Sequence, residues 1–201
     1  DRIDLKYEEI NETFSSLKQR QINDIALIGY MERPEIDFSK VNYGSQILLS
    51  KVLSILNKGD AEIFSAVTQM FANENFTLVK VQDLLLELTL DPGIYGSAPI
   101  GKKVLKEIEA GVKIFLNYAE LDIGQSLIFQ NGHCLGLETI TGTDEMIRAI
   151  INFRERNNKR PKDMLSGGIL IKGSKPDQVL DIDTPVIGPH TIKLAKNAKL
   201  N

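Results

Sequence analysis

The sequence predicts an α/β first half followed by a separate α+β second half. Two observations predict this fold class. Up to about residue 90, short apolar runs alternate with helical patterns, as they do in layers where helices connect the strands of a parallel sheet. In the second half, two strand-like runs flank Asn131-Gly132, and an Asn-Gly pair is the strongest short signal of a tight antiparallel hairpin.

Three helices and two strands are expected in the first half. Ile10, Phe14 and Leu17 lie on one face of a helix, and Asp60 is placed to cap the start of a later one. The continuous apolar run at 25–29 is typical of a strand buried on both faces of a parallel sheet. The expected helices are 6–20, 46–56 and 60–73, and the expected strands are 25–29 and 76–80.

Proline and glycine cluster between residues 90 and 101 and mark the predicted domain boundary. A helix is expected just after this boundary, at about 102–118, because apolar residues recur there at helical spacing. The predicted domains are a partial N-terminal domain at 1–95, a linker with a bridging helix at 96–120, and an α+β domain at 121–201.

The second half continues with a hairpin, a helix and a further strand. Asn131 and Gly132 both tolerate positive φ, as a type I′ turn requires. Pro189 suits the first position of a helix, which would make His190 a surface residue rather than a base. The expected strands are 126–130, 133–138 and 168–172, and the expected helix is 144–156.

Composition narrows the classes of function. A formal net charge of −3 over 201 residues lacks the basic excess that nucleic-acid binding needs, so no nucleic-acid partner is expected. No apolar run approaches the length of about 20 residues that spans a bilayer, so membrane contact is expected to be peripheral. Cys134 and two histidines are too few for a Cys/His zinc site and fit a reducing cytoplasm. The general frequency of symmetric assemblies favours a homo-oligomer.

Two polar segments in the second half are candidate parts of a site. Asp122-Ile-Gly-Gln125 leads into the hairpin, although an Asp before a strand is usually a turn former. Glu138 precedes Gly142-Thr143-Asp144, where either the hydroxyl or the carboxylate could cap the following helix. Capping is the default interpretation, but a helix N-terminus is also suited to binding phosphate.

A third segment holds the residues best suited to diphosphate chemistry. Lys172 and Lys175 flank a Gly-Ser turn and could place two ammonium groups near a diphosphate. Asp181 and Asp183 follow, and carboxylate oxygens suit a hard divalent cation such as Mg²⁺. Such a cation would lower the pKa of an attacking water. The alternative is that both acids are solvated surface residues.

In chain order, these segments resemble a known family. The residues that carry the resemblance are Gly29 with Arg33-Pro34, Gly59-Asp60, Asp122-Ile-Gly-Gln125, Glu138 with Gly142-Thr143-Asp144 and Met146-Ile147, Gly168 with Leu170 and Lys172, and Lys175-Pro176 with Gln178, Asp183, Pro185, Ile187-Gly188-Pro189 and Thr191. The family is the UDP-2,3-diacylglucosamine pyrophosphatases of bacterial lipid A biosynthesis, of the magnesium-dependent type that is not calcineurin-like.

The resemblance implies a Rossmann-like N-terminal lobe, truncated here because relatives are longer at both ends, and a separate catalytic C-terminal lobe. It implies hydrolysis of UDP-2,3-diacylglucosamine to 2,3-diacylglucosamine 1-phosphate (lipid X) and UMP, at the cytoplasmic side of the inner membrane. The candidate catalytic residues are Asp183 and Asp181, and Asp183 is the candidate Mg²⁺ ligand. The candidate substrate-binding residues are Asp122, Gln125, Glu138, Thr143, Asp144, Lys172, Lys175 and Gln178.

Three positions depart from the family pattern, and two of them, Val179 and Asp181, motivate an alternative. Thr141 and Val179 stand where relatives have acids, and Asp181 stands where they have arginine. The alternative is therefore a catalytically impaired relative that binds a UDP-sugar or lipid precursor without turnover. A third hypothesis, a nucleotide-binding lobe with an unrelated partner role, rests only on the α/β pattern of the first half.

Overall fold

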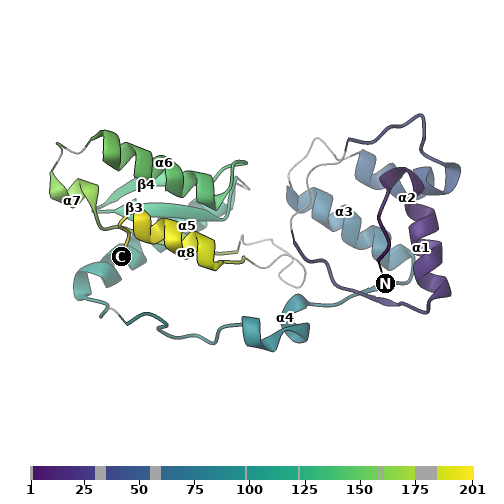
Figure 1. Cartoon of the computed structure of the whole chain (residues 1–201), viewed down its shortest axis with the longest axis horizontal. Coiled ribbons are helices and arrows are strands. Elements are labelled where there is room, and N and C mark those ends of the chain that lie inside the picture. The colour runs from purple at the N-terminus through teal and green to yellow at the C-terminus, as the bar shows by residue number, and fades with distance from the viewer. Residues whose placement is uncertain are drawn as a thin grey trace. The chain divides into compact units, whose positions relative to one another are not determined.

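The computed structural model describes residues 2–29, 35–54, 60–97, 99–121, 123–157, 159, 161–174 and 185–201. The chain is a mixed α/β protein of helices and small sheets. Its described residues divide into two compact units, one reaching to Pro92 and the other beginning at Gly93 (Figure 1). Each unit has its own hydrophobic core.

The N-terminal unit packs helices around a short pair of parallel strands. Its elements are a 3₁₀ turn at Tyr7–Glu9, α1 (Ile10–Gln19), β1 (Asp24–Ile25), α2 (Tyr43–Leu53), α3 (Asp60–Asn73) and β2 (Thr77–Leu78). Phe14 lies at the centre of the core, with its ring centroid 5.1 Å from those of both Phe71 and Phe76. The three predicted helices are confirmed, while the capping role expected of Asp60 falls outside the described side chains.

The first predicted strand is only partly confirmed. β1 pairs in parallel with β2, as expected, and Val79 N–H donates to the Ile25 carbonyl at 2.8 Å. The strand is much shorter than 25–29, however, and burial on both faces is wrong because Ile28 is 70% exposed. The pairing with β2 ends at Ile25. The Rossmann-like layout of this lobe stays a prediction.

Two short helical elements follow β2. They are α4 (Val81–Leu84) and a 3₁₀ turn at Leu86–Leu88. Neither was predicted, because one turn is too short to show a helical period. The described residues between Thr89 and Gly101 have no regular structure.

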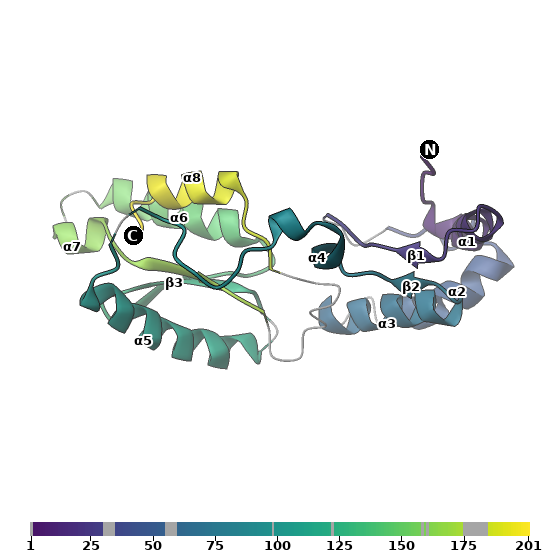
Figure 2. The same ribbon diagram turned by 90° about the horizontal axis from the view of Figure 1, so that it is seen from below.

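The C-terminal unit is a three-stranded antiparallel sheet between two layers of helices (Figure 2). Its elements are α5 (Lys102–Ala119), β3 (Ser126–Gln130), β4 (His133–Leu137), α6 (Thr143–Arg156), α7 (Lys162–Leu165), β5 (Ile169–Lys172) and α8 (Pro189–Asn197). The sheet order is β4-β3-β5. The predicted hairpin is confirmed, with φ of +49° at Asn131 and +83° at Gly132. The short α7 was not predicted.

β3 is buried along its whole length and divides the core into two. Leu127 and Phe129 pack with Phe115 of α5 on one face, while Ile128 packs with residues of α6 and α8 on the other. The helix predicted as part of the linker, α5, therefore covers a face of this sheet. Because side chains alternate along a strand, Ser126 shares the face of Ile128.

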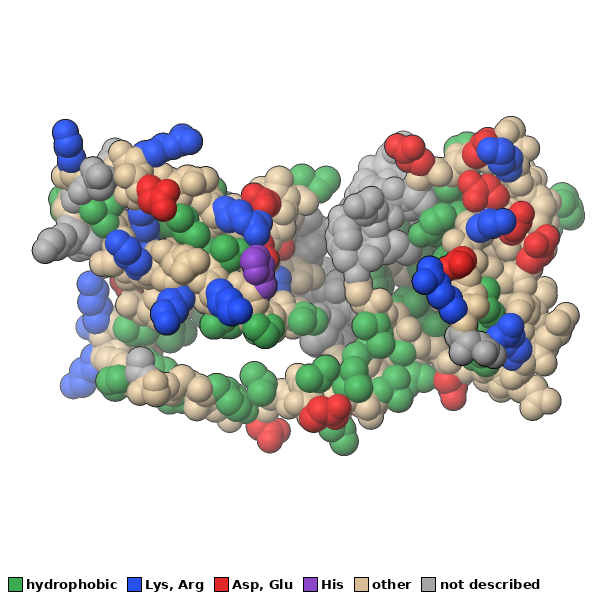
Figure 3. All heavy atoms as spheres, viewed as in Figure 1, with side chains coloured by type: hydrophobic (Ala, Val, Ile, Leu, Met, Phe, Trp, Pro, Cys, Tyr) green, Lys and Arg blue, Asp and Glu red, His purple; other side chains and the backbone are tan. Residues whose placement is uncertain are grey.

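The surface of the C-terminal unit carries many basic side chains. Figure 3 shows Lys and Arg spread over the face formed by α6 and α8, and Lys193 and Lys196 of α8 are exposed. None of the described helices combines the length and the apolar character that spanning a bilayer requires.

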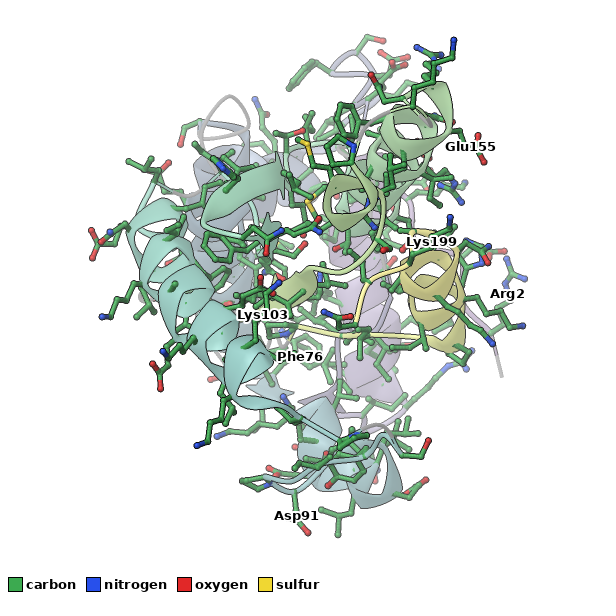
Figure 4. The ribbon with its side chains drawn as sticks, turned by 90° about the vertical axis from the view of Figure 1, so that its left-hand side faces the viewer. Arg2, Phe76, Asp91, Lys103, Glu155 and Lys199 are labelled. Carbon is green, nitrogen blue, oxygen red and sulfur yellow. The ribbon has the colours of Figure 1, made fainter. Side chains whose placement is uncertain are left out.

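α6 and α8 run parallel, with their N-termini at the same end of the sheet. Near the start of both helices, the Thr191 hydroxyl donates to Asp144 at 2.8 Å. Near their ends, buried Arg154 donates to the carbonyl of Ala198 and to Gln130 Oε1 at 2.7 Å. Figure 4 views the unit so that Glu155 of α6 and Lys199 after α8 lie at the near ends of the two helices. A group of polar residues lies at the opposite end, near the starts of both helices.

Candidate functional site

Polar residues gather where β3 begins, β5 ends and α6 begins. Antiparallel pairing sets Ser126 directly opposite Lys172. Glu138 follows β4, and its N–H donates to the Ser126 carbonyl at 2.9 Å. Thr143 is the first residue of α6. These four residues, Ser126, Glu138, Thr143 and Lys172, form the polar cluster.

The side chains of the polar cluster are joined by hydrogen bonds centred on one carboxylate oxygen. Oε2 of Glu138 accepts from the Thr143 hydroxyl at 2.8 Å and also from the Ser126 hydroxyl. Nζ of Lys172 donates to Thr143 Oγ1 at 2.8 Å and lies 3.7 Å from Glu138 Oε2. The Lys172 and Glu138 side chains are only 15% and 13% exposed, so this ion pair is largely shielded from water.

The expectation that Thr143 or Asp144 caps α6 is wrong. The N-cap residue is Gly142, at φ +85°, which has no side chain to cap the helix. The hydroxyl of Thr143 bonds within the polar cluster instead, and Asp144 bonds Thr191. Because the first amides of a helix have no partner inside the helix, this end of α6 keeps the partial positive charge that favours an anion.

A second polar group links the starts of α6 and α8. His190 Nε2 lies 3.6 Å from Asp144 Oδ2 and 3.1 Å from Arg148 Nη2. The His190 side chain is 64% exposed, so it is a surface residue, as its position after Pro189 predicted. These contacts tie Asp144 to α8, and they do not bring it into the hydrogen bonds of the polar cluster.

Gln125 is placed at the same end of the sheet. It comes one residue before β3, and its carbonyl accepts from the N–H of Gly173, the residue after β5. The structure therefore brings four of the predicted substrate-binding residues to one region, together with Asp144 at its border. The four are Gln125, Glu138, Thr143 and Lys172.

The remaining predicted site residues fall outside the described part of the chain. They are Asp122, Lys175, Gln178, Asp181 and Asp183, together with Val179 and the motif positions Arg33-Pro34, Gly59 and Pro176. The predicted catalytic residues and the predicted Mg²⁺ ligand therefore stay predictions.

The polar cluster by itself does not fit a Mg²⁺ ion. Across the described residues, no three His, Cys, Asp or Glu side chains are grouped to hold a metal. Glu138 is the one carboxylate in the cluster, and an ammonium lies 3.7 Å from its oxygen. Mg²⁺ requires several oxygen ligands in octahedral geometry, and the positive charge of Lys172 opposes a second cation there.

Three residues that sequence reasoning missed support Glu138. Besides Ser126, the Tyr118 hydroxyl donates to the Glu138 carbonyl. A Cβ on Gly124 would lie 2.3 Å from that same carbonyl oxygen, so only glycine fits there. Ser126 and Tyr118 resemble ordinary strand and helix residues in the sequence. The signal for Gly124 was its place inside the segment 122–125.

Tyr118 keeps its proton under ordinary conditions. Burial, followed by the nearby charges of Glu138 and Cys134, raises the pKa of Tyr118 to about 12. The hydroxyl is therefore a permanent donor to the Glu138 carbonyl at physiological pH.

Family models match both units of the chain. The model described as the LpxI N-terminal domain matches residues 2–88, and the one described as the LpxI C-terminal domain matches residues 91–201. The chain belongs to the LpxI family. The polar cluster lies wholly within the part that matches the LpxI C-terminal domain. The family expected from the motif residues is confirmed. Its magnesium dependence and its difference from the calcineurin-like type stay predictions.

A relative from Caulobacter vibrioides gives a second comparison. The protein named UDP-2,3-diacylglucosamine pyrophosphatase LpxI from Caulobacter vibrioides is 27% identical to this chain over 192 residues. The alignment covers 96% of this chain and 68% of the relative. The similarity therefore includes both LpxI domains.

Proposed function

We propose that this protein hydrolyses the diphosphate of UDP-2,3-diacylglucosamine to 2,3-diacylglucosamine 1-phosphate (lipid X) and UMP, a step of lipid A biosynthesis. The observation that carries the proposal is the match of LpxI family models to residues 2–88 and 91–201. The name of the Caulobacter vibrioides relative supports the substrate. The polar cluster supports it independently, because it contains an ammonium beside an uncapped helix N-terminus.

The proposed reaction adds one water across the phosphoanhydride. The water oxygen bonds to the phosphorus on the sugar side, and the bond from that phosphorus to the bridging oxygen breaks. UMP leaves with the bridging oxygen, while the phosphate of lipid X carries the oxygen of water. Negative charge develops on the phosphate oxygens as this happens, so positive groups held beside them lower the barrier.

Lys172 is the described residue best placed for this role. Its ammonium is largely shielded from water. Charge–charge interactions are stronger in such a shielded environment than in bulk solvent. The first amides of α6 follow directly after Gly142 and add hydrogen-bond donors on the same side. Lys172 would bind a non-bridging oxygen of the diphosphate, and the α6 amides would bind a second one.

We further propose that turnover requires Mg²⁺, with Asp183 as its ligand. This rests on the family resemblance and on the suitability of carboxylates for hard cations. Bound Mg²⁺ would supply neutralisation of phosphate charge and a lower pKa for a bound water. Asp181, Asp122, Lys175 and Gln178 are the other proposed contacts. The reaction is proposed to take place at the cytoplasmic surface of the inner membrane, reached by peripheral contact.

A second candidate function is binding without turnover. It is favoured by Val179 and Asp181, which replace an acid and an arginine of the family pattern in the segment expected to hold metal and phosphate. A relative altered in this way would retain the polar cluster and still bind a UDP-sugar or a lipid precursor.

The first test is UMP release from UDP-2,3-diacylglucosamine by the purified protein, measured with Mg²⁺ and with EDTA. We expect release with Mg²⁺ and its loss with EDTA. We also expect Asp183→Ala to lower the rate by at least about 100-fold, as removal of a catalytic group usually does. An exposed acid such as Glu120→Gln serves as the control and should leave the rate unchanged.

The same samples distinguish the second candidate. Calorimetry would show substrate binding without UMP release if the protein is a catalytically impaired relative. The absence of both substrate binding and UMP release would contradict both functions. An unchanged rate in Asp183→Ala would remove Asp183 from the mechanism while leaving the activity itself established.

A further inference from the structure

Two buried hydroxyl groups meet Glu138 from inside the C-terminal unit. Ser126, the first residue of β3, is 0% exposed, and its hydroxyl donates to Oε2 of Glu138. Tyr118, near the end of α5, is also buried and donates to the main-chain carbonyl of Glu138. Burying a hydroxyl costs free energy unless it is hydrogen-bonded. Both of these hydroxyls are bonded to the same residue, Glu138.

The main chain of Glu138 is held on both sides. Its N–H donates to the Ser126 carbonyl at 2.9 Å, and its carbonyl accepts from Tyr118. Gly124 makes room for this approach, since a Cβ there would lie 2.3 Å from both the Glu138 carbonyl oxygen and the Tyr118 hydroxyl oxygen. The main chain of Glu138 is thus fixed to both α5 and β3.

The carboxylate of Glu138 in turn holds Lys172. Oε2 accepts from two hydroxyls, those of Ser126 and Thr143. Lys172 donates to Thr143 at 2.8 Å and lies 3.7 Å from that same Oε2. An ammonium has three donors, so these two partners engage at most two of them. No contact within the described part of the chain takes up the third donor, which in this proposal binds an anionic oxygen.

This arrangement lowers the entropic cost of binding. A lysine side chain is among those that lose most rotamer freedom when they are immobilised, and this loss opposes binding. If Glu138 and Thr143 already hold the ammonium, a ligand does not have to order it, and its affinity rises accordingly. The contacts that fix Glu138 therefore affect ligand affinity through Lys172.

We propose that Ser126 and Tyr118 are positioning residues that act through Glu138 to hold the Lys172 ammonium for a phosphate oxygen of the substrate. The inference rests on the proposed function, in which Lys172 binds the diphosphate. Ser126 is fully buried, so in this proposal it acts from behind the residues that would contact the substrate. Glu138 was predicted as a substrate-binding residue. In this arrangement its role is to orient Lys172.

The first experiment observes Lys172 without any ligand. In the full chain labelled with ¹⁵N-lysine, the hydrogen-bonded ammonium of Lys172 should give a resolved signal because its protons exchange slowly with water. We expect Ser126→Ala and Tyr118→Phe to broaden or remove this signal. Thr139→Ala and Tyr43→Phe, which remove hydroxyls from exposed residues, should leave it intact. An unchanged signal in both test variants overturns the proposal, whether or not the protein turns over substrate.

The second experiment measures UDP affinity by calorimetry in a double-mutant cycle. We expect Ser126→Ala to weaken UDP binding by about tenfold, the size of one lost hydrogen bond to a charged group. In a Lys172→Met background, the same substitution should change affinity by less than about twofold, because the group it acts through is gone. A merely structural role for Ser126 would give the same loss in both backgrounds, and that result overturns the proposal.

Should Ser126→Ala fail to fold, Tyr118→Phe provides the same cycle, because it removes only a hydroxyl. The outcomes also separate this inference from the proposed function. Positioning shown by both experiments, with no UMP release from the natural substrate, would leave the inference standing and contradict the enzyme activity. UDP affinity unchanged by either variant, despite loss of the Lys172 signal, would contradict a role in substrate binding.

Discussion

Tyr118 shows how a single buried residue makes stability depend on pH. Its pKa is raised to about 12, above its ordinary value in the unfolded chain, so the folded state holds the proton more tightly. The contribution of protonated Tyr118 to the stability of the folded state is fully present below about pH 10. It is lost as pH rises through the pKa of Tyr118 in the folded state. Tyr118→Phe cannot titrate, and it removes this dependence.

We therefore expect stability of the original chain to fall between about pH 10 and pH 12 by about 2 kcal/mol more than that of Tyr118→Phe, since one pKa unit corresponds to about 1.4 kcal/mol. Urea denaturation at a series of pH values would measure this. Tyr43→Phe, at a highly exposed tyrosine, should follow the original chain. Parallel pH profiles for the original chain and Tyr118→Phe would contradict the assignment.

At the scale of elements, the hairpin between β3 and β4 places Glu138 beside Ser126. The turn needs positive φ at both of its residues, and Gly132 has φ +83° with open space around its Cβ position. A substitution there tests backbone strain alone, without a steric clash.

We expect Gly132→Ala to lower the free energy of unfolding by about 1 kcal/mol, the usual cost of a side chain at positive φ. Gly96→Ala provides a control, because Gly96 also has open space around it but no positive φ. Urea midpoints for the two variants and the original chain give the comparison. Equal midpoints for Gly132→Ala and the original chain would argue against the type I′ turn.

At the scale of the whole molecule, each of the two units has its own hydrophobic core. The core of the N-terminal unit centres on Phe14, and those of the C-terminal unit lie on either face of β3. A domain with its own core can fold by itself. The polar cluster belongs wholly to the second unit.

We expect residues 93–201 expressed alone to fold and to keep the Lys172 ammonium signal of the full chain. Dispersed amide resonances and a single cooperative unfolding transition would show this. An unfolded spectrum would mean that the C-terminal unit depends on residues 1–92. The full chain measured under the same conditions is the control.

The sequence by itself determined the main helices, the hairpin, the strand ending at Lys172 and the family. These follow from local information. The spacing of Ile10 and Phe14 indicates one face of a helix, and Asn131-Gly132 indicates the turn. The order of the motif residues along the chain identifies the family without knowledge of any contact. The strand predicted at 25–29 was too long, because an apolar run does not show where pairing with another strand ends.

Only the tertiary structure decided how the site is held together. Tyr118 meets Glu138 from 20 residues away, and Lys172 meets Thr143 from 29 residues away. Neither separation is a period of a helix or a strand, so no local pattern could have predicted the pairs. The same applies to Thr143, which looked like a helix cap until the register of β3 and β5 placed Lys172 within reach of its hydroxyl. Sequence spacing reports contacts within an element, whereas contacts between elements are set by how the sheet and helices pack.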